Sequence, residues 1–83
     1  MCELFSRVTL RHDFPEFRLR RGDVATVVDQ HEGEEGQETG YSVEVFNAVG
    51  ETIAVLVVAE SELEHLSENG IFNVRQFDET VAA

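Results

Sequence analysis

The stretch Tyr41–Ala59, YSVEVFNAVGETIAVLVVA, decides the fold because it holds two strand-forming segments joined by a tight turn. In Tyr41–Phe46 apolar and polar residues alternate, so every second side chain lies on one face. Asn47–Gly50 is typical of the turn. Thr52–Ala59 is the most apolar run of the chain, and its length between turn signals is typical of a strand that is buried on both faces. We therefore expect it near the middle of the fold.

The same reasoning predicts two earlier strands. Phe5–Arg11 alternates, with Val8 and Leu10 on the inward side, and Val24–Gln30 is rich in β-branched residues. Between the second of these and Tyr41 lies His31–Gly40, which contains three glycines, four glutamates and no apolar residue. This composition predicts a solvated hairpin loop.

An Arg-Gly-Asp tripeptide stands at positions 21–23, directly before one of these strands. The tripeptide is an adhesion signal in some extracellular proteins. Gly22, however, can adopt a positive φ without steric cost, which suits a turn into a strand. The chain also has a single cysteine, and its N-terminus lacks the basic start and apolar middle of a signal peptide. We therefore predict a structural turn and a cytoplasmic location.

The C-terminal part is less regular. Glu60–Ser67 fits either one helical turn or a single 3-10 turn followed by a short closing strand. Ile71–Phe77 is either an additional strand or a packed tail, and Asp78–Ala83 is expected to be frayed. Four or five short strands with tight turns predict an all-β fold, a small antiparallel barrel or sandwich. We expect one domain over residues 1–83, with its core at 4–66 and a C-terminal extension at 67–83.

Four motifs in a fixed order resemble a bacterial family, the domain-of-unknown-function family 4926. They are DFPE at 13–16, LRRGDVATVV at 19–28, YSVEVF at 41–46 and GET at 50–52. The resemblance covers about residues 4–66 and implies a small SH3-like barrel of about five strands without established catalytic residues. Some genes of the family lie beside genes for toxin-like proteins, which implies a partner. Ala25 stands where members usually have glycine, so a strained backbone or a shifted bulge is expected there.

The charge is distributed unevenly along the chain. Residues 1–21 hold five arginines and three acids, a net charge of +2, whereas residues 22–83 hold one arginine and 14 acids, a net charge of −13. A negative field of this size repels phosphate backbones and anionic lipid, and it attracts a basic partner. No apolar run is long enough to span a membrane.

A non-catalytic protein-binding module is the function that these features favour. The loop 14–21 combines aromatic residues with arginines, the residue types enriched at binding hot spots, and we expect its apolar side chains to be tucked against the core. The acidic loop would steer a basic partner. The candidate partner-binding residues are Phe14, Phe17, Arg18, Arg20, Arg21, Glu32, Glu34, Glu35 and Glu38.

Two alternatives remain open at this point. The chain can be a homo-oligomeric structural module whose acidity serves only solubility. Less favoured is an RNA-binding barrel, in which Arg18, Arg20 and Arg21 contact phosphates while nearby aromatic rings stack on bases.

Catalysis and cofactor binding are not expected. Cys2 stands beside the N-terminus without a recognisable base, and no nucleophile motif occurs. His12, His31 and His65 are far apart in the sequence, and the acidic loop lacks the ligand spacing of an EF-hand. We therefore expect no bound metal ion.

Overall fold

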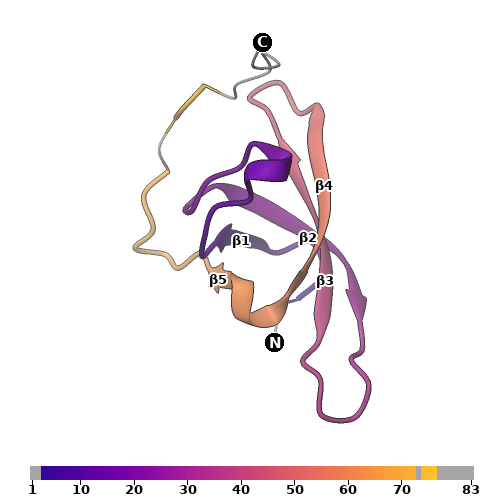
Figure 1. Ribbon diagram of the computed structural model, residues 1–83. Helices are drawn as coiled ribbons and strands as arrows, with labels where there is room; N and C mark the ends of the chain where they lie inside the picture. Colours follow the sequence, from indigo (N-terminus) through magenta and orange to yellow (C-terminus); the bar gives the residue numbers. More distant parts are fainter. Residues whose placement is uncertain (1–2, 73, 77–83) are drawn as a thin grey trace.

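The computed structural model describes residues 3–72 and 74–76 and shows five antiparallel strands in one sheet (Figure 1). The strands are β1 (Arg7–Leu10), β2 (Val24–His31), β3 (Gly40–Phe46), β4 (Thr52–Ala59) and β5 (Leu63–His65). Two 3-10 turns, η1 (Pro15–Phe17) and η2 (Glu60–Glu62), are the only helical elements in the described part. The predicted all-β fold with five antiparallel strands is confirmed.

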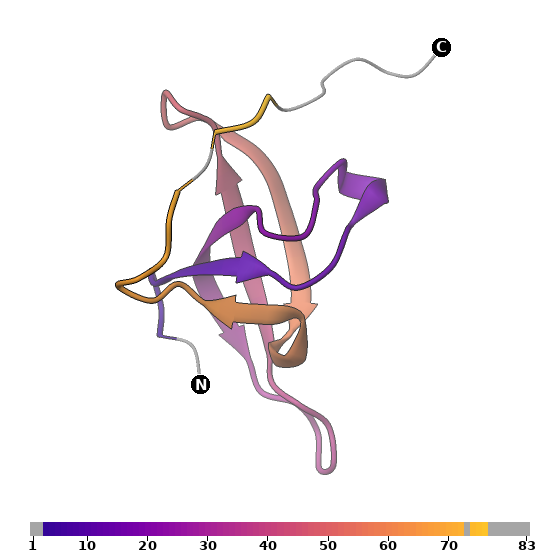
Figure 2. The same cartoon turned by 90° about the vertical axis from the view of Figure 1, so that its left-hand side faces the viewer.

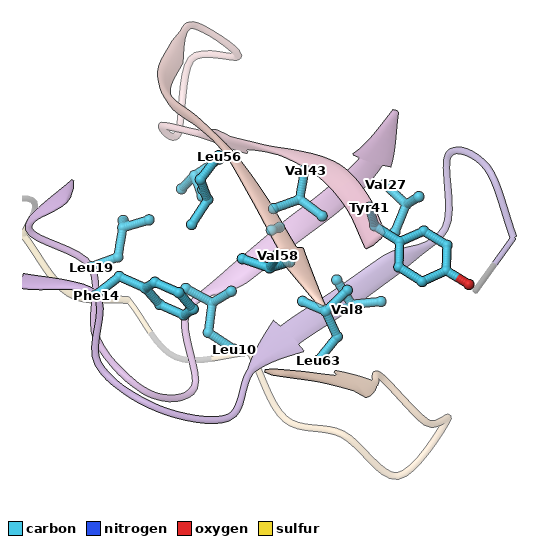
Figure 3. Close-up of a cluster of buried hydrophobic side chains, with 12 residues drawn as sticks. Val8, Leu10, Phe14, Leu19, Val27, Tyr41, Val43, Leu56, Val58 and Leu63 are labelled. Carbon is cyan, nitrogen blue, oxygen red and sulfur yellow. The ribbon is translucent and has the colours of Figure 1, made fainter. Parts of the chain in front are cut away.

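The sheet has the strand order β4-β3-β2-β1-β5 and coils around its own core. Figure 2 shows β1 and β5 crossing in front of β3 and β4. The predicted inward faces are confirmed, because Val8 and Leu10 of β1 and alternate residues of β3 are buried. Figure 3 shows Val8, Leu10, Tyr41 and Val43 in one cluster of buried side chains. The buried cluster consists of Val8, Leu10, Phe14, Leu19, Ala25, Val27, Tyr41, Val43, Val45, Leu56, Val58 and Leu63.

The first strand is shorter than predicted. It begins at Arg7 because Phe5 has a φ of 64°, which interrupts the extended backbone, and the Phe5 ring is exposed. The irregularity predicted at Ala25 is not seen there as a positive φ. Ala25 lies within β2, is buried and pairs with Val8.

The prediction that Thr52–Ala59 is buried on both faces in the middle of the fold is wrong. β4 is the last strand of the sheet order, and its only strand neighbour in the described part is β3. Leu56 and Val58 face the core, whereas Val55 is 53% exposed and Val57 is 68% exposed. The outward positions carry valine instead of polar residues, and for this reason the sequence shows no alternation.

For Glu60–Ser67 the second of the two predicted alternatives is confirmed, since η2 is followed directly by β5. η2 carries the chain from β4 at one edge of the sheet to β5 at the other. The Glu62 carboxylate accepts a hydrogen bond from the Ala59 N–H (2.8 Å), and the Glu60 N–H donates to the Thr39 carbonyl (2.9 Å). These contacts hold the turn that starts the coiling of the sheet.

The C-terminal extension forms no strand in its described residues after His65. Residues 71, 72 and 74–76 are exposed, and Arg75 reaches back to the loop before β2. Phe72 lies under the guanidinium of Arg7, with the Arg7 Cζ 5.6 Å from the ring centre. The predicted frayed segment Asp78–Ala83 and Cys2 lie outside the described residues.

Candidate protein-binding surface

The loop between β1 and β2 is shaped by a backbone bridge between Phe14 and Leu19. The Phe14 N–H donates to the Leu19 carbonyl (2.9 Å), and the Leu19 N–H donates to the Phe14 carbonyl (3.1 Å). Pro15 starts η1 between them, since its fixed φ suits a first helical position. Arg18 then adopts a left-handed φ of 59°, which returns the chain to Leu19.

This bridge separates the two aromatic residues of the loop. Phe14 is 7% exposed and stacks on the His12 ring, with ring centres 4.3 Å apart. Phe17 is 37% exposed, so the prediction that it is tucked against the core is wrong, whereas the same prediction for Phe14 and Leu19 is confirmed. The bridge pulls its two members inward, and η1 between them is pushed out to the surface.

A shallow hollow of about 310 Å³ lies where η1 meets the start of β4. Phe17 and the half-buried Ile53 and Ala54 supply its apolar lining. Glu16 and Arg18 complete the lining and place one charge of each sign at the hollow. We call these five residues the Phe17 hollow. The combination of aromatic, aliphatic and guanidinium groups is the one enriched where proteins bind proteins.

The turn before β2 is held by two carboxylates. Asp13 accepts a hydrogen bond from the Arg21 N–H (2.9 Å), and Asp23 accepts one from the Arg20 N–H (2.8 Å). Gly22 has a φ of 91°, which confirms the predicted turn.

The Asp23 carboxylate also binds Arg75 through both oxygens. The Arg75 Nε donates to one oxygen (2.7 Å), and Nη2 donates to the other. Partial burial by itself would raise the pKa of Asp23, but the hydrogen bonds from Arg75 and from the Arg20 N–H outweigh it and hold the pKa below its ordinary value. An adhesion signal must present its aspartate to a receptor, whereas this aspartate is bound inside the molecule.

The predicted arginine cluster lies on the exposed side of the same loop. Arg18, Arg20 and Arg21 are all exposed, and Arg18 and Arg20 line a second hollow of about 290 Å³ together with Arg75. Asp13, Pro15 and Leu19 complete that lining. The arginines are thus interleaved with carboxylates, so the structure does not group them into a purely basic patch.

The acidic loop lies at the other end of the molecule. Residues 32–39 form the tip of the β2–β3 hairpin, which projects at the bottom of Figure 1, away from η1 near the top. Glu32, Glu34 and Glu35 are exposed there. Glu38 instead accepts hydrogen bonds from the N–H (2.7 Å) and hydroxyl (3.0 Å) of Ser61, so it anchors η2.

The two candidate regions are therefore separate. The Phe17 hollow lies at the Ile53 end of β4, and Glu38 contacts Ser61 just beyond the Ala59 end. A strand of eight residues spans roughly 25 Å. Reasoning from the sequence placed both loops correctly at the surface but missed that an exposed, uncharged strand runs between them.

Metal-ligand clusters and membrane-spanning helices are two further features that can be looked for in the described residues. Within 3–72 and 74–76, no three histidine, cysteine, aspartate or glutamate side chains gather closely enough to hold a metal ion. Across that same part of the chain, no helix has the length and apolar character needed to cross a membrane.

Comparison with known proteins gives one finding. Neither a curated protein nor a solved structure matches this chain. A family model described as "Domain of unknown function (DUF4926)" matches residues 4–65, which is most of the chain and ends at the last residue of β5. The chain thus belongs to the DUF4926 family.

Proposed function

We propose that this chain is a non-catalytic, cytoplasmic protein-binding module whose partner is a basic protein. The observation that carries the proposal is the exposure of Phe17. The loop closes its backbone bridge on Phe14 and Leu19 and leaves a large aromatic ring at the surface, beside Arg18 and an apolar patch of β4. Exposure of an apolar ring to water is unfavourable in the isolated protein, and covering the ring contributes to binding when a partner is present.

The charge supports a basic partner. The chain carries a net charge of −11, and the exposed glutamates of the acidic loop lie at the tip of the projecting β2–β3 hairpin. Charges at such a tip act mainly on the rate of encounter, because they attract a basic surface over several ångströms without being buried in the contact. The Phe17 hollow would then supply the short-range contact.

The experiment is capture of partners from a native lysate of the source organism on immobilised protein, followed by mass spectrometry. We expect a basic protein, retained by the wild type at low salt and released at high salt. Phe17→Ala should lose most of this retention. Val49→Ala is the matched control, because it shortens an apolar side chain that is 79% exposed in the β3–β4 turn.

The acidic loop is tested with the triple variant E32Q/E34Q/E35Q. It should slow association of the captured protein several-fold at low salt and have little effect at high salt. The control E3Q/E64Q/E68Q removes the same charge at exposed positions elsewhere. Equal rates for the two triple variants would contradict steering by the loop, and retention of nothing but copies of the chain itself would contradict the proposed function.

A further inference from the structure

The two edges of the sheet are protected very differently. β5 has three residues, and two of them, Glu64 and His65, are exposed polar side chains. β4 has eight residues, no charge and no proline, and it exposes Val55 and Val57. Natural proteins usually shorten, charge or cover an edge strand because its unpaired backbone groups attract other strands. Within residues 3–72 and 74–76, β4 has none of these defences.

The hydrogen-bond pattern shows which backbone groups of β4 face outward. The Glu60 N–H donates to the Thr39 carbonyl, so these two residues form a hydrogen-bonded pair next to the Gly40–Ala59 pair. Hydrogen-bonded and non-hydrogen-bonded pairs alternate along an antiparallel ladder. Leu56 and Val58 therefore direct their N–H and C=O groups to β3, while Val55 and Val57 direct theirs away from it.

A second contact supports this assignment. Ala59 has the same parity as Val55 and Val57, and its N–H indeed points away from β3, to the Glu62 carboxylate. The backbone groups of Val55 and Val57 have no such partner among the described residues. We call the backbone groups and outward side chains of these two valines the β4 edge.

On these grounds we propose that the β4 edge accepts an extended, basic segment of another protein as an additional antiparallel strand. This inference rests on the proposed function and deepens it, since it names the binding mode and the chemistry of the partner. Backbone hydrogen bonds to Val55 and Val57 would supply register, and apolar side chains opposite them would cover the exposed valines.

The surroundings of the edge favour a basic occupant over a second copy of this chain. Glu51 precedes β4, and Glu44 pairs with Val55 on the outward face. Antiparallel pairing of two β4 strands about Leu56 would join two chains that each carry a net charge of −11. Parallel pairing would place Glu51 of one copy near Glu51 of the other copy. Both arrangements oppose like charges, whereas lysine or arginine at the ends of a foreign strand meets opposite charges.

The position of the edge also connects the two surfaces described above. One end of β4 borders the Phe17 hollow, and the other leads to η2, to which the acidic loop is anchored through Glu38. A strand lying along β4 would therefore reach both, with its side chains over the hollow at one end and basic residues near the hairpin tip at the other.

The probe for this inference is the synthetic peptide KKVTVTVKK, acetylated and amidated at its ends, added to the full-length protein. The measurement is amide hydrogen exchange by NMR. In the free protein we expect Val55 and Val57 to exchange fast, and Leu56 and Val58 to exchange slowly. With the peptide at about ten times its Kd, exchange at Val55 and Val57 should slow about tenfold, because only the unbound fraction remains open.

Two N-methylated peptides test strand pairing itself. Residues directly opposite one another in an antiparallel pair share a face, so the peptide valines should lie opposite Val55 and Val57 and use their own amides for pairing. Methylation of the three valine nitrogens should abolish binding, and methylation of the two threonine nitrogens should not. Equal binding of both peptides, or unchanged exchange at Val55 and Val57, would overturn the inference.

A pair of variants completes the test. Val57→Lys places a positive charge on the edge and should weaken peptide binding at least tenfold. Val49→Lys makes the same change in the β3–β4 turn and should leave binding within twofold. If light scattering instead shows a dimer that V57K dissociates, the edge belongs to a second copy and the inference is wrong. Because lysate capture with F17A does not depend on this peptide, the proposed function can stand when the strand-addition inference fails.

Discussion

Asp23 belongs to a tripeptide that resembles a recognition signal, but its side chain has a structural role. Its carboxylate accepts hydrogen bonds from Arg75 and from the Arg20 N–H, and its side chain is 14% exposed. Arg75 also donates to the Arg18 carbonyl (3.4 Å). One guanidinium thereby ties the C-terminal extension to the loop that presents Phe17.

Replacement of Asp23 by Asn should lower the free energy of unfolding at pH 7 by about 1 kcal/mol, the scale of a partly exposed ion pair. The pKa of Asp23 is lowered in the folded state, so its stabilising contribution is present above the ordinary value of 3.8 and is lost as the pH falls through the folded pKa. Urea titrations at several pH values should therefore show that the free energies of unfolding of wild type and D23N become equal in acid. Arg75→Gln is the companion variant, and the double variant should lose less than the sum of the two single losses.

The contribution of His12 to stability should depend on pH in the opposite sense. The Asp13 carbonyl and then the Glu62 carboxylate raise its pKa above 6.5 by hydrogen bonding to the ring. Its contribution to stability is therefore complete below 6.5 and is lost as the pH rises through the folded pKa. An NMR titration should give a His12 pKa above 6.5 in the wild type and a smaller increase in Glu62→Gln. Glu64→Gln serves as the control, and an unchanged pKa in E62Q would show that Glu62 does not act on this ring.

Among the elements, the β1–β2 loop buries one of its two phenylalanines and exposes the other. Phe14→Ala removes a buried ring and should lower the free energy of unfolding by about 3–5 kcal/mol. Phe17→Ala removes a partly exposed ring and should lower it by less than about 1 kcal/mol. Denaturant unfolding of the two variants measures the difference. A loss in F17A as large as that in F14A would mean that Phe17 belongs to the core, and it would remove the basis for the proposed surface.

Most of the strands could be predicted because their burial alternates. β3 follows this rule, and so does the inward side of β1. β4 does not, since its outward valines are as apolar as its inward residues, and periodicity alone cannot distinguish two-sided burial from an uncovered edge. Phe17 was misplaced because the Phe14–Leu19 bridge decides its direction. The contact between Asp23 and Arg75 joins residues 52 positions apart and leaves no local signal.

At the scale of the whole molecule, repulsion among the acids opposes folding. The formal net charge is −11, because 17 acids stand against only six arginines. Raising NaCl from about 0.01 M to 0.15 M, which shortens the Debye length from about 30 Å to 8 Å, should therefore raise the thermal midpoint by a few degrees. The variant E32Q/E34Q/E35Q should start from a higher midpoint and gain less from salt. A midpoint that falls with salt would mean that favourable ion pairs outweigh this repulsion.

Tyr41 gives the molecule a built-in optical reporter. It is the only tyrosine of a chain that has no tryptophan, its ring is fully buried in the core (Figure 3), and its hydroxyl donates to the Glu60 carboxylate at 3.3 Å. Because the six phenylalanines absorb at shorter wavelengths, the absorbance and circular dichroism bands of tyrosine and the emission above 300 nm come from one known position beside the β4–η2 junction. Unfolding of the core can be followed there without a label, and a ligand without aromatic groups, such as a peptide that lacks aromatic residues, can be added without a signal of its own.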